Sequence, residues 1–340
     1  MSPHPRHLPR FSALVVLLLV ASLVTACSSI DSTFTPRAGG GGDGDQVVRV
    51  GTLRGQPHLF MPFFYQQFLD EGTKAEVLVF DSSPDVKNAL VSGQIDAAVM
   101  GVPAMLAGAA AQQDVRLIAS SADGGSAIVG SPDVTRVGDL RGKRVGYPIG
   151  SSQEVILRST LTQAGIDPDR ELTLVNLAFS DMANAYASGQ IDAFSSAEIG
   201  PSVAKQNGAH DVVSPYNTPI GKVNIGLAAT QRTIDAAPGL VQTIVDAHAE
   251  AVAFMDTHRD EWRDRVVGEF GLDPAVAAGA IANTWPRADL NDEYVSQVDA
   301  LAREMFALDQ LPTQPEMSQF VDDTFVQSAA TTTQQAGDRK

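Results

Sequence analysis

Residues 88–97 read NALVSGQIDA and residues 184–193 read NAYASGQIDA, so two stretches 96 positions apart share eight of ten residues. In each stretch a helix-compatible segment ends at a glycine, Gly93 or Gly189, where the left-handed backbone of a helix C-cap is expected. An apolar run follows each Ile-Asp-Ala and indicates a buried strand. The repeat predicts two α/β halves of similar construction, with the ligand between them. The alternative is a coincidence between two ordinary helix-to-strand joints.

The composition is that of a globular protein large enough for two domains, with 340 residues, 44% of them hydrophobic and 19% charged. The net charge of −16 argues against nucleic acid as a partner, because a phosphate backbone needs a basic surface. It does not exclude a small anion, which a few backbone N–H groups can hold. We therefore expect a small-molecule ligand and no nucleic acid.

Residues 1–26 have the layout of a secretory signal peptide. Arg6 and Arg10 precede an apolar run over residues 11–24, and small residues then lead to Cys27, the only cysteine of the chain. The pattern resembles a bacterial lipoprotein signal, in which this cysteine is lipidated and becomes the new N-terminus. An ordinary secretory signal with a stray cysteine is the alternative. Because Cys27 is unique, an internal disulfide and a cysteine metal site are excluded.

Two further segments lack the pattern of a folded element. Residues 27–46 contain four consecutive glycines and almost no apolar side chain, which predicts a flexible tether behind the lipidated cysteine. Residues 327–340 are polar and predict a disordered tail. The expected location is therefore extracytoplasmic, on the outer face of the cell membrane, with Cys27 as the lipid anchor.

Strand and helix signals alternate from residue 47 to residue 229. Apart from the strands of the two repeat copies, the segments that predict strands are 47–53, 77–80, 115–119, 127–130, 145–147, 172–177, 211–213 and 223–229. A polar break is expected over residues 120–125, and helical spacing resumes at residues 61–69. The chain is expected to be almost wholly helical from residue 234 to residue 325.

These signals divide the folded part into two lobes. Lobe I is predicted to comprise residues 47–122 and 224–326, and lobe II residues 123–223. The strand at residues 223–229 has no equivalent inside either repeat, and we interpret it as the return crossing into lobe I. Two crossings, near residues 121–126 and 220–223, then form a hinge of two chain segments.

The order and spacing of these features resemble the extracytoplasmic solute-binding proteins of ABC importers, in the branch that serves taurine, aliphatic sulfonates, nitrate or the thiamine-precursor pyrimidine. The resemblance covers roughly residues 47–326, and no single motif in it is specific. The residues that carry it are Phe80, Ala89 to Asp96, Gly101, Leu140 to Val145, Pro148, Gly150, Ser151, Leu161, Ala164, Gly165, Gly189 to Ala193, Trp262 and Phe270 to Leu272.

The resemblance implies an α/β fold of the two-lobed type II periplasmic-binding-protein kind, with two hinge crossings and a helical C-terminal region. It also implies a monomer that takes no cofactor, closes on a small ligand and delivers it to an ABC permease with its ATPase. The sequence departs from the family after the second repeat, where Ala197-Glu198-Ile199 stands in place of an aromatic residue followed by an acid and proline. Gly101-Val102-Pro103 also carries fewer polar donors than many relatives have there.

Candidate ligand contacts stand where strands end and helices begin, because α/β folds bind ligands there. They are Arg54, Gln56, His58, Gly101, Ser120, Ser121, Ser151, Ser152, Ser180, Asp181 and Glu198. Ser151 and Ser152 open a helix whose free N–H groups suit an anion. The alternatives are a plain capping box at Ser151 with Glu154, an N-cap at Ser180 and Asp181, helix packing at Gly101, and a surface loop after the first strand.

Glu198 bears on the identity of the ligand. A carboxylate at the edge of a cleft repels a simple anion and pairs with an ammonium group, which favours a zwitterion such as taurine over nitrate. A solvent-facing glutamate at the start of a helix is the alternative.

Catalysis is not expected. Ser202 and Lys205 spell Ser-x-x-Lys, the nucleophile motif of penicillin-recognising enzymes, but the partner motifs are missing or in the wrong order. His210, His248 and His258 lack metal-ligand spacing, so no metal site is expected. A ligand-sensing receptor, in which the closed lobes signal to a partner protein, is the competing function.

Overall fold

The computed structural model describes residues 46–327. The predicted signal peptide and Cys27 lie outside the described residues. So do the predicted tether, except for Gln46, and the predicted tail, except for Gln327. Within the described part, no helix has both the length and the apolar character needed to cross a membrane. The described residues belong to one compact unit, Ala38–Lys340.

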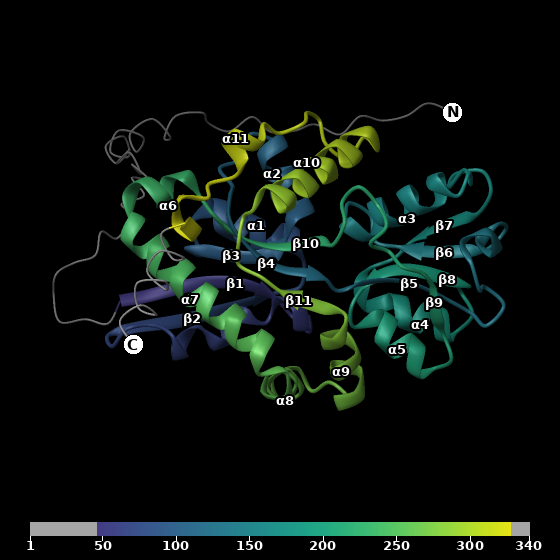
Figure 1. Cartoon of the computed structure of the whole chain (residues 1–340), viewed down its shortest axis with the longest axis horizontal. Helices are drawn as coiled ribbons and strands as arrows, with labels where there is room; N and C mark the ends of the chain where they lie inside the picture. The colour runs from purple at the N-terminus through teal and green to yellow at the C-terminus, as the bar shows by residue number, and fades with distance from the viewer. Residues whose placement is uncertain (1–45, 328–340) are drawn as a thin grey trace, which may run out of the picture. The chain divides into compact units, whose positions relative to one another are not determined.

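The strands form two separate sheets (Figure 1). The six-stranded sheet consists of β1 (Gln46–Leu53), β2 (Thr73–Phe80), β3 (Ala97–Gly101), β4 (Arg116–Gly124), β10 (Val223–Ala229) and β11 (Thr284–Pro286). The five-stranded sheet consists of β5 (Ser126–Gly130), β6 (Arg144–Tyr147), β7 (Thr173–Asn176), β8 (Ala193–Ala197) and β9 (His210–Val213). The predicted α/β construction with two lobes is confirmed.

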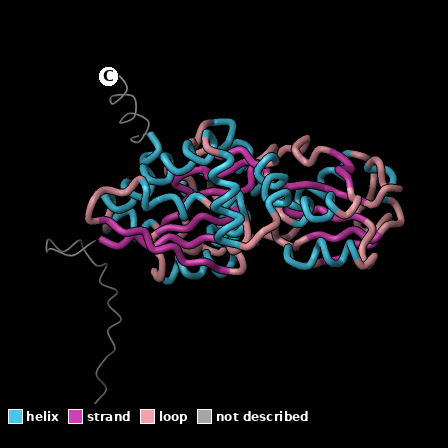
Figure 2. The backbone as a smooth tube through the Cα atoms, turned by 90° about the horizontal axis from the view of Figure 1, so that it is seen from below, coloured by secondary structure: helices cyan, strands magenta, loops and turns pink. Residues whose placement is uncertain are grey.

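Helices lie on both faces of the sheets (Figure 2). The α-helices are α1 (Ser83–Ser92), α2 (Val102–Ala110), α3 (Ser152–Gln163), α4 (Met182–Ala187), α5 (Gly200–Gln206), α6 (Gln231–Ala236), α7 (Pro238–Thr257), α8 (Arg259–Phe270), α9 (Pro274–Ala282), α10 (Asp292–Ala307) and α11 (Met317–Phe320). The 3-10 helices are η1 (Pro57–Leu59), η2 (Met61–Gln67), η3 (Val137–Leu140) and η4 (Phe179–Asp181).

Both sheets follow one plan once β11 is set aside. The orders are β2-β1-β3-β10-β4 and β7-β6-β8-β5-β9. In each sheet the first three strands in the order are parallel, and the fourth is antiparallel to its neighbours on both sides. This antiparallel strand, β10 or β5, is the first strand that the chain forms after it crosses from the other sheet. The prediction that residues 223–229 have no equivalent is therefore wrong, because β5 is the counterpart of β10.

The repeated sequence builds the same contact in each sheet. A Cβ atom on Gly51 of β1 would lie 2.5 Å from Cδ1 of Ile95, and one on Gly146 of β6 would lie 2.7 Å from Cδ1 of Ile191. Ile95 and Ile191 are the isoleucines of the two repeat copies, and both are buried. Each glycine thus makes room for the isoleucine that leads into the neighbouring strand, so the repeat sets the packing of its strand.

The aspartate of each repeat copy bonds to the backbone of the neighbouring parallel strand, which is β1 in one sheet and β6 in the other. Asp96 accepts a hydrogen bond at 2.8 Å from the backbone N–H of Arg49, and its own N–H donates to the carbonyl of Arg49 at 2.9 Å. Asp192 makes both bonds to Arg144, each at 2.9 Å. Because these bonds lie at the start of the parallel pair, the repeat sets the register of its strand as well.

The first crossing between the sheets is shorter than expected. β4 runs through the predicted polar break as far as Gly124, so only Gly125 separates it from β5. Both glycines have positive φ, 80° and 67°, and a Cβ atom on Gly124 would lie 2.4 Å from the ring of Trp285. The helical region also contains β11, which the sequence did not predict. β11 pairs with the end of β4 and so lies beside this crossing.

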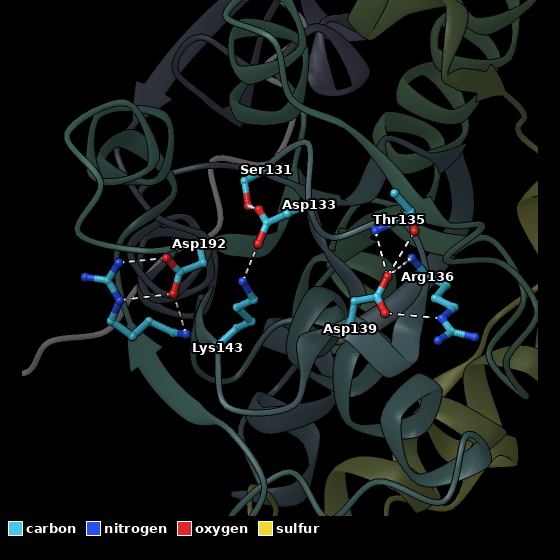
Figure 3. Close-up of polar contacts among 8 residues, drawn as sticks. Ser131, Asp133, Thr135, Arg136, Asp139, Lys143 and Asp192 are labelled. Carbon is cyan, nitrogen blue, oxygen red and sulfur yellow. Dashed lines mark hydrogen bonds and ion pairs between the residues drawn. The ribbon is translucent and has the colours of Figure 1, made fainter.

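The loop between β5 and β6 is held by polar contacts on the surface of lobe II (Figure 3). Asp133 accepts hydrogen bonds from Ser131 at 2.7 Å and from Lys143 at 2.5 Å. The Lys143 hydrogen bond is the main cause that lowers the pKa of Asp133 to about 2. Asp139 caps the turn that begins η3, accepting from the N–H groups of Thr135 and Arg136. Exposed ion pairs add little stability, so we assign these contacts to loop geometry.

Candidate ligand-binding site

Asn283, between α9 and β11, joins lobe I to the crossing and to lobe II. Its carbonyl accepts from the N–H of Gly125 at 2.7 Å, and its Nδ2 donates to the carbonyl of Ser126 at 2.9 Å and to Glu198 at 3.1 Å. The hydroxyl of Tyr216 lies 2.7 Å from Oδ1 of Asn283. The crossing is therefore held on both sides by buried or half-buried hydrogen bonds.

Several buried polar atoms near this crossing have no hydrogen-bond partner. They include Oε1 of Gln56 and Nδ1 of His58 in lobe I, and Oγ of Ser152 and Oγ of Ser196 in lobe II. Oδ1 of Asp123, directly before the crossing, is a further one, on a carboxylate whose other oxygen accepts from Arg287. A buried polar atom without a partner costs about 1–3 kcal/mol, so most such atoms in native proteins are paired. Unpaired atoms contributed by both lobes beside one crossing indicate where a polar ligand would be held.

His58 contacts the crossing directly, Ser152 and Ser196 are joined to it through their neighbours in the chain, and Gln56 lies two positions before His58. A Cβ atom on Gly125 would lie 3.2 Å from the ring of His58. Ser126 pairs with Ala197, the residue after Ser196, and its hydroxyl accepts from Gln153 at 2.8 Å. Gln153 follows Ser152 at the start of α3. The candidate site is thus defined as Gln56, His58, Ser152 and Ser196.

His58 is neutral in this setting. The residue is 2% exposed, and burial lowers the pKa of its imidazole to about 3. A neutral imidazole carries one donor and one acceptor nitrogen. Together with the hydroxyls of Ser152 and Ser196, the site offers neutral groups that can both donate and accept hydrogen bonds.

Three of the predicted residues, Gln56, His58 and Ser152, belong to this group. Ser151 caps α3, because its hydroxyl accepts from the N–H of Glu154 at 3.3 Å and donates to the carbonyl of Pro148 at 2.6 Å. Ser151 is thus an N-cap, but the reciprocal bond of a capping box is not formed, because the Glu154 carboxylate accepts from the N–H of Gly150. Its neighbour Ser152 is left with an unpaired hydroxyl.

Ser120 and Ser121 are engaged inside lobe I. The hydroxyl of Ser120 donates to the carbonyl of Asp289 at 2.5 Å. The hydroxyl of Ser121 lies 3.3 Å from Nε2 of His248, whose Nδ1 lies 2.7 Å from the hydroxyl of Tyr65. The Ser121 contact holds β4 against α7, and the Ser120 contact holds the segment before α10, so both hydroxyls already have partners inside lobe I.

The remaining predicted residues lie on the surface or support helices. Ser180 and Asp181 are exposed and bond to each other at 3.3 Å. Arg54 is exposed and pairs with Asp81 at 3.1 Å. The N–H of Gly101 donates to the hydroxyl of Ser83 at 3.2 Å, so this strand end faces the start of α1.

Glu198 is buried at the contact between the lobes. It is 1% exposed, so the solvent-facing alternative is wrong. One carboxylate oxygen accepts from both the N–H and the hydroxyl of Ser202, and the other accepts from Asn283. The carboxylate therefore caps α5 and joins the lobes in this arrangement, and Oε1 accepts only the bond from Asn283.

Ser196 and Asn283 were missed by reasoning from the sequence. The pair Ser195-Ser196 stands in the fully buried strand that follows the second repeat copy. Two adjacent hydroxyls in a buried strand need partners, and this signal was available in the sequence. The hydroxyl of Ser195 donates to the carbonyl of Gln153 at 2.8 Å, whereas that of Ser196 has no partner. No comparable signal marks Asn283. Among residues 46–327, no three His, Cys, Asp or Glu side chains are placed to hold a metal ion.

Comparison with solved structures defines the class of fold. The alkanesulfonate-binding protein SsuA from Xanthomonas axonopodis pv. citri, bound to MOPS, superposes with a TM-score of 0.71 at 21% identity, covering 83% of this chain and 100% of that one. The desulfurization enzyme DSZB superposes with a TM-score of 0.64 at 18% identity, covering 84% of this chain and 99% of the enzyme. The chain has the predicted two-lobed type II periplasmic-binding-protein fold.

Sequence comparison then places the chain in a family. Residues 66–261 match the NMT1/THI5-like family, and the chain belongs to it. The taurine-binding periplasmic protein of Escherichia coli strain K12 is 32% identical over 126 residues, which is 36% of this chain and 39% of that protein. The matches to the curated relatives span about two fifths of those relatives' length, 38% and 39%.

Proposed function

We propose that the protein is the solute-binding component of an ABC importer, which captures a small organic anion or zwitterion of the sulfonate type and delivers it to a permease. The observation that carries the proposal is the group of buried, unpaired polar atoms contributed by both lobes beside one crossing. A ligand that pairs with atoms of both lobes favours the closed form, because it gains those contacts only when the lobes meet.

The chemistry of the candidate site suits such a head group. Hydroxyls at Ser152 and Ser196, with the N–H groups at the start of α3, can donate to sulfonate oxygens. The neutral imidazole of His58 and the amide oxygen of Gln56 offer acceptors for an amino group. Ligand selection then rests on these neutral groups, because Glu198 is already bonded. Kinship with a taurine-binding protein supports this class of ligand.

The lipid anchor at Cys27 and the location outside the cell membrane complete the proposal, on the strength of the sequence pattern. No catalytic step is proposed. The shared fold of an enzyme, DSZB, makes turnover an outcome to be tested with the same ligands.

The test is a thermal-shift screen of the chain from Ala38 onward, followed by calorimetry. The panel holds taurine, alkanesulfonates, nitrate, bicarbonate, amino acids and pyrimidines. A ligand at about 100 times its Kd should raise the free energy of unfolding by about 2.7 kcal/mol. A sulfonate hit without turnover supports the proposal. A hit confined to nitrate or to pyrimidines would overturn the sulfonate assignment, and a panel without hits would count against it too.

Variants then test the site. We expect Ser196→Ala and Ser152→Ala each to weaken binding about tenfold, the effect of one lost hydrogen bond to a charged group. Ser180→Ala is the matched control, since Ser180 is exposed and bonds only its neighbour. Glu198→Gln should weaken taurine and an alkanesulfonate equally. A selective loss of taurine would restore Glu198 as an ammonium partner.

A sensing role and a transport role differ in the partner protein that responds to the ligand-bound form. A transport component should stimulate the ATPase of its permease complex when the ligand is bound. Ligand binding without any such stimulation would favour the receptor alternative.

A further inference from the structure

The lobes also touch away from the crossing, where α10 of lobe I meets α3 of lobe II. Two side-chain hydrogen bonds span this contact. Nε2 of Gln310 donates to Oε2 of Glu154 at 2.7 Å, and the hydroxyl of Ser159 donates to Glu304 at 3.4 Å. The Gln310 bond is short and ends on a carboxylate, so it is the stronger of the two.

Local structure after α10 directs Gln310 toward lobe II. Asp309 follows the helix with φ of 56°, and the N–H of Gln310 bonds back to the carbonyl of Met305 at 2.9 Å. The next residue, Leu311, is buried in an apolar cluster that also contains Leu157 of α3. The backbone of Gln310 is therefore held while its side chain crosses to the other lobe.

Glu154 connects this contact to the candidate site. Its side chain is 5% exposed. Oε2, the atom that Gln310 contacts, also accepts from the N–H of Gly150 at 2.8 Å, and Oε1 accepts from Arg158 at 3.0 Å. Gly150 belongs to the loop that leads to Ser152, whose hydroxyl is unpaired. One carboxylate oxygen thus holds both the opposite lobe and the loop that presents Ser152.

A third lobe contact, between α9 and α5, carries a hydrogen bond from Nε2 of Gln206 to Asp273 at 3.3 Å. The Asn283 and Gln310 contacts differ in what they hold. Asn283 bonds the backbone of the crossing itself, so it can move with the crossing when the lobes rotate. Gln310 bonds only a side chain of α3, and its own Oε1 is buried without a partner. A half-satisfied amide loses less when the contact opens, because water then reaches both of its ends.

We propose that Gln310 is a positioning residue, a latch that forms when the lobes close and that holds the Gly150–Ser152 loop in its ligand-binding position through Glu154. This inference rests on the proposed function, since it assigns the latch to ligand capture. Gln310 itself is not placed in contact with the ligand.

The first experiment measures lobe opening without any ligand. Cys27 is the only cysteine of the chain, so the chain from Ala38 onward can carry one introduced cysteine per lobe. Asp81 and Ala178 are exposed and follow the equivalent strands β2 and β7. Spin labels at Asp81→Cys and Ala178→Cys report the distance between the lobes. We expect Gln310→Ala to lengthen it and Gln314→Ala, whose side chain bonds Asp299 within lobe I, to leave it unchanged.

A distance distribution identical in Gln310→Ala and the parent protein would overturn the proposal, even if the variant were less stable. This result does not depend on the identity of the ligand, so the latch can fail while the proposed function stands. The reverse also holds, because Gln310→Ala can lengthen the distance between the lobes in a protein that binds none of the tested sulfonates.

The second experiment uses affinity and charge. With a ligand from the screen, Gln310→Ala should weaken binding about tenfold, mainly through faster dissociation, and Gln314→Ala should not. Gln310→Glu places a second carboxylate against Glu154, beside Arg158 and near Glu304. The label distance should then be longest at pH 7.5 and shorten toward pH 5, because two facing carboxylates share a proton more readily. A pH-independent distance in Gln310→Glu would contradict the contact with Glu154.

Discussion

The joints built by the two repeat copies share their backbone contacts but differ in electrostatics. In lobe I, burial is the main cause that raises the pKa of Asp96. In lobe II, hydrogen bonds from the Arg144 guanidinium are the main cause that lowers the pKa of Asp192. The side chain of Arg49, the counterpart of Arg144, pairs instead with Glu76 at 3.4 Å.

The two joints show that the repeated motif specifies packing geometry but not the charge state of its aspartate. The isoleucine and aspartate of the repeat reach backbone and glycine positions that are equivalent in the two sheets, so identical residues give identical geometry. The charge on the aspartate depends on a side chain from another strand and on what covers it. Equal sequence therefore predicts equal packing, but it does not predict the ionisation of the aspartate.

The largest expected effect tests the packing. Ile95→Ala and Ile191→Ala should each lower the free energy of unfolding by about 3 kcal/mol, since each leaves a cavity over a glycine that cannot fill it. Urea unfolding followed by circular dichroism measures both. Val47→Ala, which truncates a more exposed side chain in the same sheet as Ile95, is the control and should stay within about 0.5 kcal/mol. A large effect in one lobe and none in the other would show that Ile95 and Ile191 do not make equivalent packing contacts.

A smaller effect is expected at the glycines. Gly51→Ala and Gly146→Ala should each cost about 1–3 kcal/mol, because the new methyl group overlaps the Cδ1 atom of the repeat isoleucine. Ile95→Val and Ile191→Val remove that atom, so each double variant should recover part of the loss. Strictly additive losses in the double variants would show that the glycines and the isoleucines do not share this contact.

The smallest effect concerns ionisation. Asp192→Asn should lower the free energy of unfolding by about 0.5–1 kcal/mol at pH 7, the worth of a partly exposed ion pair. Because the folded-state pKa of Asp192 lies below its ordinary value, this stabilisation is present above about pH 4 and is lost as the pH falls through the folded-state pKa. The stabilities of the variant and the parent protein should therefore converge once the pH is below the folded-state pKa of Asp192.

Asp96→Asn supplies the contrast. A raised pKa means that charging Asp96 opposes folding as the pH rises through it, so the carboxylate stabilises the fold less at pH 7 than at low pH. The asparagine oxygen can still accept from the N–H of Arg49. Unfolding measurements at pH 7 should thus show a smaller loss for Asp96→Asn than for Asp192→Asn. The opposite order would contradict the assigned pKa directions.

The candidate site was only partly predictable. Gln56, His58 and Ser152 follow strand ends, and strand ends can be located from local apolar patterns. Ser120 and Ser121 had the same local pattern, but Asp289 and His248, more than 120 positions away, occupy their hydroxyls. Trp285 of β11, a strand that the sequence did not predict, is 38% exposed, with Lys222 over its ring at 3.8 Å.

The sequence by itself determined the repeated helix-to-strand joint, the two α/β lobes and most of the strands, because each depends on residues close together in the chain. Only the tertiary structure decided which polar groups stay unpaired, that Glu198 is bonded within the lobe contact, and that Asn283 and Gln310 join the lobes. Hydrogen-bond partners of buried groups come from segments far apart in sequence. Their pairing follows from the folded arrangement and has no local pattern.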